Sequence, residues 1–295
     1  MLGLILHNGS SYKPDLNSLY NQALDFTKSH YENFPVVSFF TPKELRKYIA
    51  VVYQFARQAD DIADEGNYSD EQRITKLDNY NNALNNSANN LFENDFWFLF
   101  NDTKVKKNLS VENFRNLLRA FRQDITKKRY ENYEELQRYC ENSANPVGRI
   151  ILEIYNIRNK DAIKHSDEIC TALQLTNFYQ DVSIDYQKGR IYIPQNDMKN
   201  FLVSEKDIQS KEHSKNFIEL MKFEIKRTKE LFNEGRKILD YLPFRLKIQI
   251  QATIYGGEAI LNKIEKLNFD VTNQNPKLNK NDFVKIFFKA VLTGT

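Results

Sequence analysis

The chain has 295 residues, a net charge of +3, and only 9 Gly and 7 Pro. So small a net charge gives no basic surface for nucleic acid, which excludes a nucleic acid partner. No stretch approaches the roughly 18 apolar residues of a membrane-spanning helix.

The scarcity of turn-forming residues favours a few long helices, so we expect an all-α protein in one domain, residues 1–295. The two cysteines, Cys140 and Cys170, form no metal-like cluster and suit a reduced, cytoplasmic compartment. A disulfide between them is not expected.

In chain order, the first clear helix begins at residues 41–44, Thr-Pro-Lys-Glu, which have the pattern of a capping box with Pro at the first helical position. Apolar residues then recur at three- and four-residue steps as far as Ala63, and Gly66 can end the helix. Pro146 should kink a later helix, and residues 189–194 should form a short extended loop. Further helices are expected over 70–92, 111–125, 132–156, 161–186, 204–211, 213–241, 244–267 and 280–292.

The C-terminal range 283–292 is amphipathic and contains lysines. Two interpretations are open. The range is either a final helix packed on the core or a helix that docks on a membrane surface.

The end of the first helix concentrates four carboxylates within about one and a half turns: Asp60, Asp61, Asp64 and Glu65. Like charges three and four residues apart repel, and this end carries the negative pole of the helix dipole, so a cation should compensate. Asp60 and Asp64 share one helix face, and carboxylates so placed suit Mg²⁺, which completes its shell with water and phosphate oxygens. The alternative is a solvated acidic helix end with Arg57 as a local ion pair.

A second polar set follows far downstream, at four-residue spacing on one face of the helix 161–186: Asn177, Asp181 and Asp185. Directly after it come two cations and a hydroxyl: Lys188, Arg190 and Tyr192. A diphosphate held by metal ions would need such groups to neutralise its charge. The alternative is a helix end that turns polar as it leaves the core.

These two sets resemble the aspartate-rich motifs of the squalene/phytoene synthase family. The resemblance extends from about residue 18 to residue 265 and rests on the ranges 38–40, 55–64, 121–124, 139–149, 177–185 and 189–194. Within the family, three strings are most similar to bacterial hydroxysqualene synthases of the hopanoid pathway: 56–66, 145–149 and 177–181.

The resemblance implies an isoprenoid synthase helical bundle with a central cavity, in which about three Mg²⁺ ions bridge the acidic motifs to a prenyl diphosphate. In the hydroxysqualene branch, presqualene diphosphate and water would give hydroxysqualene and diphosphate, and no NADPH is expected. Two alternatives stay open. One is a head-to-head condensing synthase that forms presqualene diphosphate, squalene or phytoene from farnesyl or geranylgeranyl diphosphate. The other is a non-catalytic family relative.

The resemblance also implies roles for single residues. The catalytic metal ligands are Asp60, Asp64, Asp181 and Asp185, with Asp61 and Asn177 as supporting ligands. The diphosphate contacts are Arg57, Lys188, Arg190 and Tyr192, and the residues at the mouth of the cavity are Ser38, Tyr53 and Tyr130. Gly148 leaves room for a prenyl chain or for close packing at the Pro146 kink. A water-insoluble product would suit peripheral association with the inner face of the membrane, whereas the sequence gives no oligomeric state.

Overall fold

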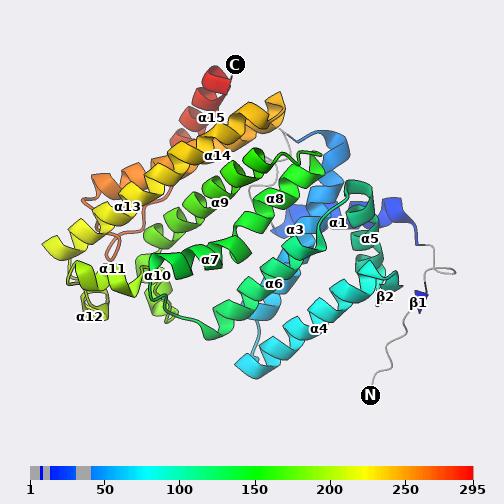
Figure 1. The fold of residues 1–295 in the computed structure, drawn as a ribbon, viewed down its shortest axis with the longest axis horizontal. Coiled ribbons are helices and arrows are strands. Elements are labelled where there is room, and N and C mark those ends of the chain that lie inside the picture. The colour runs from blue at the N-terminus through cyan, green and yellow to red at the C-terminus, as the bar shows by residue number, and fades with distance from the viewer. Residues whose placement is uncertain (1–6, 9–13, 31–40, 295) are drawn as a thin grey trace. The chain divides into compact units, whose positions relative to one another are not determined.

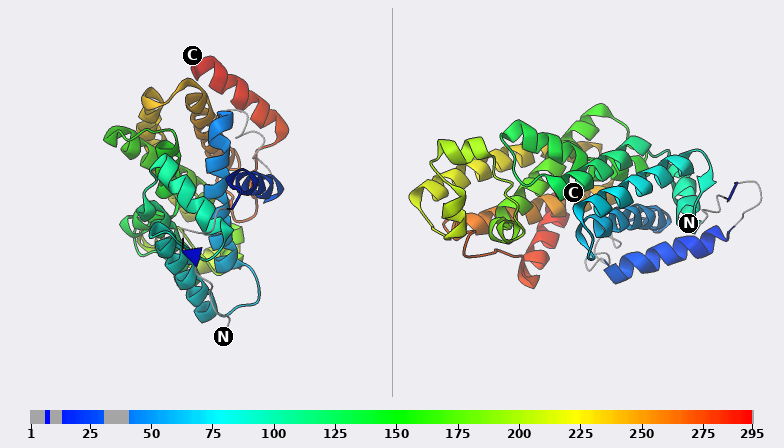
Figure 2. Two further views of the ribbon diagram at one scale, coloured as in Figure 1. Left: turned by 90° about the vertical axis from the view of Figure 1, so that its right-hand side faces the viewer. Right: turned by 90° about the horizontal axis from the view of Figure 1, so that it is seen from below.

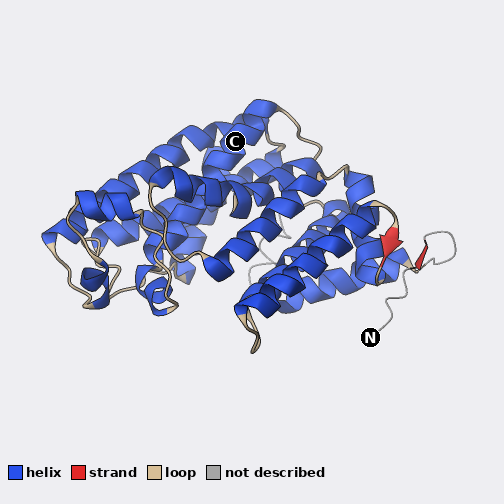
Figure 3. Cartoon of the chain, turned by 60° about the horizontal axis from the view of Figure 1, so that its bottom comes forward, coloured by secondary structure: helices blue, strands red, loops and turns tan. Residues whose placement is uncertain are grey.

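The computed structural model describes residues 7–8, 14–30 and 41–294. Apart from one pair of two-residue strands, every regular element in these ranges is a helix (Figure 1, Figure 3). The all-α prediction is therefore confirmed. None of the described helices is both long enough and apolar enough to cross a bilayer.

Contacts between residues divide the chain into two compact units. Unit 1 comprises Met1–Thr126 and Arg149–Arg158, and unit 2 comprises Lys127–Gly148 and Asn159–Thr295. The first acidic set therefore lies in unit 1 and the second in unit 2.

Unit 1 contains two paired strands and a group of helices around a shared apolar core. The elements are β1 (His7–Asn8), α1 (Leu16–His30), α3 (Lys43–Asp64), α4 (Asp70–Ala88), β2 (Leu91–Phe92), α5 (Asp95–Lys107), α6 (Val111–Thr126) and most of α8 (Asn145–Ile154). Helix α3 packs against α1, α4, α5 and α6. Its Phe55 is buried, with its ring centroid 5.0 Å from that of Phe114 and 5.3 Å from that of Phe100. Helical periodicity then turns Arg57, Asp60 and Asp64 away from this core.

The start of α3 corrects the predicted capping box. The helix begins at Lys43, its N-cap is Pro42, and no side-chain cap bond forms there. Pro42 has an extended backbone, with ψ 137°, so the helix starts after this residue instead of at it. The end of α3 agrees with the prediction, because Glu65 is the C-cap and Gly66 follows in the left-handed region with φ +78°.

The helix expected over 70–92 is too long, and α1 and α5 were not predicted. Helix α4 ends at Ala88, and Asn90 then adopts φ +60°, a conformation that Asn tolerates better than most residues. The Asn94 side chain next caps α5 by accepting a hydrogen bond of 3.2 Å from Trp97 N. The apolar pattern over 70–92 therefore continues past the end of α4 and through β2 (Leu91–Phe92).

Unit 2 holds the remaining helices. They are α7 (Tyr133–Ser143), α9 (Lys160–Gln180), α10 (Val182–Gln187), α11 (Gln195–Asn200), α12 (Glu205–Gln209), α13 (Lys215–Gly235), the 3-10 helix η1 (Arg236–Tyr241), α14 (Phe244–Lys266) and α15 (Lys280–Gly294). Helix α9 packs along α13 and also contacts α7 and α14, and α15 lies beside α14 (Figure 2). Helix α11 was not predicted, and the helix expected over 213–241 divides into α13 and η1.

The helix expected over 132–156 is interrupted close to the predicted kink, because α7 ends at Ser143 and α8 begins at Asn145. The interruption lies before Pro146, which is in the first turn of α8. Next to it, a Cβ atom on Gly148 would lie 2.4 Å from Ser166 Oγ and 2.6 Å from Cys170 Sγ, both on α9. Of the two roles considered for this glycine, the geometry supports close packing.

Candidate active site

The first acidic segment, residues 60–65, surrounds one guanidinium group. Arg57 Nη2 lies 2.7 Å from Asp61 Oδ1, and Arg57 Nη1 lies 3.5 Å from Asp60 Oδ2. Arg57 Nη2 also pairs with Glu65, to which the sequence assigned no role. The local ion pair considered for Arg57 is therefore present, and one cation contacts three carboxylates at once.

This single cation does not offset the crowding at Asp60. Burial raises the pKa of Asp60, the neighbouring charge of Asp64 raises it further, and Arg57 opposes both only in part. The Asp60 side chain is nevertheless 45% exposed, so a hydrated cation can reach it. A divalent cation would stabilise the ionised form of these carboxylates, and hard oxygen donors are what Mg²⁺ prefers.

No group of three His, Cys, Asp or Glu side chains within 7–8, 14–30 and 41–294 forms a preformed metal site. Mg²⁺ is commonly bound through one or two carboxylates, with water and substrate phosphate as its other ligands. The donors at Asp60 and Asp64 fit that chemistry.

The next turn back along α3 carries Tyr53. Its hydroxyl donates a hydrogen bond of 3.0 Å to the carbonyl oxygen of His30, at the end of α1. Burial raises the pKa of Tyr53, so it stays a neutral hydroxyl. Ser38, the other residue expected near this end of the chain, lies outside the described residues.

A second arginine binds the backbone at the end of α3. Arg73 Nη1 donates to the carbonyl oxygens of Ile62 at 3.1 Å and Glu65 at 2.9 Å, and its Nη2 donates to that of Gly66 at 2.8 Å. These bonds satisfy carbonyl groups that the end of a helix leaves without partners. The negative pole of the helix dipole therefore has a cation bound directly to its carbonyl oxygens.

The second acidic segment, residues 177–185, is not one helix as predicted. Helix α9 ends at Gln180, and Asp181 separates it from α10 with φ −104° and ψ 19°. Two backbone hydrogen bonds bridge the break, from Asp181 N to Asn177 O at 2.9 Å and from Asp185 N to Asp181 O at 2.8 Å. The helical spacing of the three polar residues therefore persists through the break.

Asn275 binds Asp181 from the connection between α14 and α15. Its Nδ2 donates to Asp181 Oδ1 at 2.6 Å and to the carbonyl oxygen of Gln180 at 3.2 Å. Sequence reasoning missed this residue, because its neighbours carry no motif and the contact spans 94 positions.

The loop predicted after α10 is present, and residues 190–194 belong to no helix or strand. Arg190 N donates to the Asp185 carbonyl oxygen at 2.8 Å, and Ile191 N donates to the Lys128 carbonyl oxygen at 3.0 Å. Gly189 precedes them with φ +75°, and Lys188 caps α10. The backbone therefore keeps Lys188 and Arg190 directly beside the end of the second acidic segment.

Tyr192, in this loop, lies inside an aromatic cluster. Its ring stacks on Phe178 with centroids 3.7 Å apart and planes at 5°, and on Tyr130 with centroids 5.7 Å apart and planes at 22°. Tyr139 completes the cluster, with its centroid 6.0 Å from that of Tyr192. The structure thus brings Tyr130 and Tyr192 together as buried rings, while their contact with substrate stays a prediction.

A buried network of charged and phenolic side chains joins four helices of unit 2. The Tyr179 hydroxyl donates to Glu224 Oε2 at 2.6 Å, and Arg227 Nη2 pairs with Glu224 and, at 3.0 Å, with Asp197 Oδ2. The Arg227 guanidinium carbon lies 3.6 Å from the ring centroid of Tyr133. Because Tyr179 stands two residues before Asp181 in the sequence, the network fixes the end of α9.

Glu224 is the member of this network whose ionised form is most disfavoured by burial. It is fully buried, and burial raises its pKa to about 7 although Arg227 and the Tyr179 hydroxyl act in the opposite direction. Sequence reasoning missed it, but a signal existed. Glu224 interrupts the buried apolar stripe of α13, which consists of Phe217, Leu220, Met221, Ile225 and Phe232.

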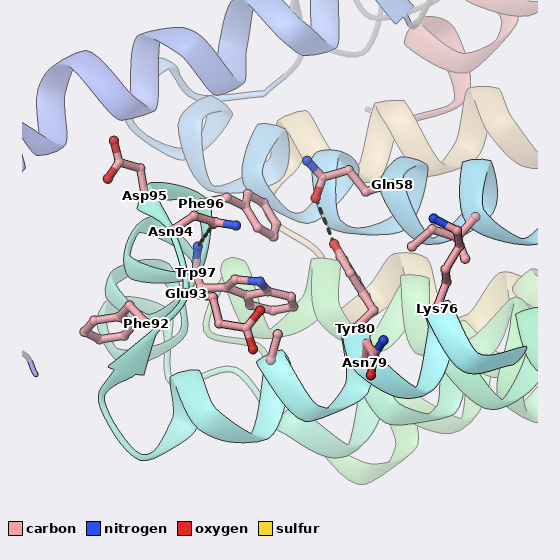
Figure 4. A pocket seen from close by; sticks show the side chains of 12 residues that line it. Gln58, Lys76, Asn79, Tyr80, Phe92, Glu93, Asn94, Asp95, Phe96 and Trp97 are labelled. Carbon is pink, nitrogen blue, oxygen red and sulfur yellow. Dashed lines mark hydrogen bonds between the residues drawn. The ribbon is translucent and has the colours of Figure 1, made fainter. Parts of the chain in front are cut away.

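A pocket of about 620 Å³ opens in unit 1 (Figure 4). Helix α3 contributes Gln58 and Ile62, and Tyr80 Oη donates to Gln58 Oε1 at 3.0 Å, as the dashed line shows. Gln58 lies two residues from Asp60, on another face of the helix. The pocket is therefore not lined by the carboxylates of the first acidic segment.

Comparisons with known proteins agree with the predicted family. The family model described as squalene/phytoene synthase matches residues 27–282, a range that includes Asn275. The hydroxysqualene synthase of Zymomonas mobilis is 37% identical over 187 residues, a match that spans only 62% of this chain and 62% of that relative. The 15-cis-phytoene synthase of Synechococcus elongatus is 25% identical over 92% of both chains.

Solved structures give the same fold. The crystal structure of squalene synthase HpnC from Alicyclobacillus acidocaldarius is 34% identical and matches with a TM-score of 0.83. The match covers 89% of this chain and 99% of that one. With its two acidic segments and its all-α isoprenoid synthase fold, the chain belongs to the squalene/phytoene synthase family and is an isoprenoid synthase.

Proposed function

We propose that the protein is a Mg²⁺-dependent hydroxysqualene synthase, which converts presqualene diphosphate and water into hydroxysqualene and diphosphate. The observation that supports the metal-dependent chemistry is the crowding of carboxylates around Asp60, which adds to the effect of burial in raising the pKa of this residue. The choice of substrate rests on the similarity to the Zymomonas mobilis relative of that name and to HpnC.

Four carboxylates, Asp60, Asp64, Asp181 and Asp185, would hold Mg²⁺, with support from Asp61 and Asn177. When bound, Mg²⁺ supplies Lewis-acid stabilisation of the leaving diphosphate. We propose that both acidic segments serve one substrate and that the two units act as one catalytic domain.

Arg57 is proposed to change partners when metal and substrate arrive. In the structure it neutralises part of the charge of Asp60, Asp61 and Glu65. With these carboxylates compensated by a metal ion, the guanidinium group of Arg57 would be available for a diphosphate oxygen. Lys188, Arg190 and Tyr192 would bind the same leaving group.

No reductant enters this proposal, because capture of the carbocation by water leaves the oxidation state of the carbon skeleton balanced without NADPH. The residues proposed at the mouth of the site are Ser38, Tyr53 and Tyr130. Their task would be to admit the prenyl chains while limiting access of further water.

One observation favours a second candidate, a head-to-head condensing synthase. The phytoene synthase of Synechococcus elongatus matches this chain over more of its length than the Zymomonas mobilis relative does. Such an enzyme would consume two prenyl diphosphates, so the two candidates differ in the substrate that each accepts alone.

The decisive experiment incubates the purified protein with presqualene diphosphate and, separately, with farnesyl diphosphate, each with Mg²⁺ or with EDTA. We expect hydroxysqualene from presqualene diphosphate only, and only with Mg²⁺. Turnover of farnesyl diphosphate alone would establish the condensing synthase. If neither substrate is turned over, geranylgeranyl diphosphate is tested next, and only failure with all three would point to a non-catalytic relative.

Variants Asp64→Asn and Asp185→Asn test the metal ligands. Both should stay folded and lose Mg²⁺-dependent turnover. The matched control is Asp78→Asn, an exposed carboxylate on α4 that pairs with Arg122. Near-normal activity of either ligand variant would disprove its assignment.

A further inference from the structure

Helix α15 presents a large apolar face to solvent. Its exposed apolar side chains are Phe283, Val284, Phe287, Phe288 and Leu292. At helical spacing they cover about half of the circumference, and Phe288 and Leu292 are 59% and 75% exposed. Scattered single exposed apolar residues are ordinary, but a continuous face of this kind marks an interaction site.

The opposite face of α15 is firmly attached to α14. Ala290 is fully buried, and Lys263 Nζ pairs with Asp282 Oδ2 at 2.9 Å. Gln251 Nε2 donates to Thr293 Oγ1 at 2.7 Å, and Lys289 Nζ lies 3.9 Å from the ring centroid of Tyr255. Helix α15 is therefore attached to α14 along its length, so the orientation of its apolar face within unit 2 is fixed.

The charges on α15 are nearly all positive. Lys280, Lys285 and Lys289 are exposed, and Lys277 precedes the helix. The one carboxylate of the helix, Asp282, is already paired with Lys263. A helix with aromatic and aliphatic residues on one side and lysines beside them is the pattern of an interfacial helix.

We propose that the exposed face of α15 docks the protein on a lipid surface with anionic headgroups, with the helix lying parallel to the membrane. The phenylalanines and Leu292 enter the boundary between headgroups and acyl chains, and the lysines bind the headgroups. The range 283–292 would then be both a final helix packed on the core and a helix that docks on a membrane, because one face packs on the protein and the other on lipid.

The charge pattern favours lipid over a second copy of the chain. Two copies meeting through this face would bring their lysines together, and α15 offers no free carboxylate to pair with them. Anionic headgroups supply that missing negative charge. The inference does not depend on the proposed reaction, since docking uses no residue of the acidic segments.

Vesicle co-sedimentation of the full chain, without substrate, tests the proposal. We expect binding to vesicles of phosphatidylglycerol and phosphatidylcholine, weaker binding to phosphatidylcholine alone, and loss of the difference at high salt. The double variant Phe288→Ser/Leu292→Ser should weaken the partition by at least about tenfold. The double variant Lys280→Gln/Lys285→Gln should weaken binding to the anionic vesicles by about fivefold per lysine.

The matched control is Val105→Ser, a lone apolar side chain in unit 1 that is 66% exposed and should leave binding unchanged. Equal melting temperatures of all variants would exclude unfolding as the cause. The proposal is overturned if the unmodified protein does not bind anionic vesicles. It is also overturned if the variant Phe288→Ser/Leu292→Ser binds them as strongly as the unmodified protein. A dimer that this double variant dissociates, without vesicle binding, would instead make the face an interface between copies.

Discussion

Asn275 Nδ2 donates a hydrogen bond of 2.6 Å to Asp181 Oδ1 and so connects the segment before α15 to the second acidic segment. A hydrogen bond to a carboxylate both orients it and favours its ionised form. Asn275 is therefore a positioning residue for a proposed metal ligand.

Replacing Asn275 by Ala should raise the Mg²⁺ concentration needed for half-maximal activity by about tenfold, since a hydrogen bond to a charged group contributes about 1.5–3 kcal/mol. Titration of activity against Mg²⁺ checks this. The control is the neighbouring Gln274→Ala, whose side chain contacts Asp270 instead. An equal response of both variants would show that Asp181 does not need its partner.

Arg57→Gln should make the protein more dependent on Mg²⁺ for stability. Without the guanidinium group, Asp60, Asp61 and Glu65 lose their common partner and repel one another. We expect a melting temperature lower by about 2–4 °C in EDTA, as for a loss near 1 kcal/mol, and a larger rise on adding Mg²⁺ than in the unmodified protein.

Arg119→Gln is the matched control for Arg57, because Arg119 pairs with Glu112, outside the acidic segment. Its response to Mg²⁺ should equal that of the unmodified protein. If Arg57→Gln also responds in that way, Arg57 and Mg²⁺ do not act on the same carboxylates.

Glu224 should make stability fall as pH rises. Burial raises its pKa in the folded protein to about 7, above the ordinary value of 4.5. Between these two values the folded state binds more protons than the unfolded state, so the free energy of unfolding decreases with pH and then levels off above pH 7.

Relative to Glu224→Gln, the unmodified protein should therefore lose at most about 3 kcal/mol between pH 4.5 and pH 7, from the size of the shift. Urea unfolding of both proteins at several pH values measures the difference. Glu205→Gln is the control. Because Arg129 lowers the pKa of Glu205, this residue should change the stability only at pH values below the ordinary glutamate pKa. A difference that stays constant with pH would show that Glu224 is ionised like an exposed glutamate.

Gly148→Ala should destabilise the protein by about 1–3 kcal/mol, the usual cost of overpacking. The added Cβ would meet Ser166 Oγ at 2.4 Å and Cys170 Sγ at 2.6 Å. Urea unfolding measures the loss. Gly256→Ala is the control, since its Cβ would meet only Leu278 Cδ1, at 3.8 Å, and Ala favours a helix over Gly. Unchanged stability of Gly148→Ala would refute the packing role.

Local patterns predicted much of the fold and both acidic segments. The apolar repeat before Ala63, the interruption of the helix near Pro146 and the loop after Gly189 each depend on residues within one or two turns, and the structure contains all three. No local sequence pattern indicated the helix break at Asp181, because the backbone hydrogen bonds on both sides of it keep the four-residue spacing of a continuous helix.

Long-range contacts lay beyond sequence reasoning. Asn275 reaches Asp181 across 94 positions, and no pattern near either residue specifies the other. Tyr192 looked like a polar hydroxyl beside two cations, yet its ring is buried against Phe178. Of these residues, Glu224 alone could have been recognised from the sequence, because it is a carboxylate within an apolar helix face.

The three hydrogen bonds from Arg73 have a consequence for how the loop after α3 can vary. One guanidinium group spans the carbonyl oxygens of Ile62, Glu65 and Gly66, so these residues must stay within its reach. Surface loops ordinarily accept insertions with little cost. An insertion between Glu65 and Gly66 would separate the acceptors, so this turn should tolerate changes of residue type at exposed positions but not changes of length.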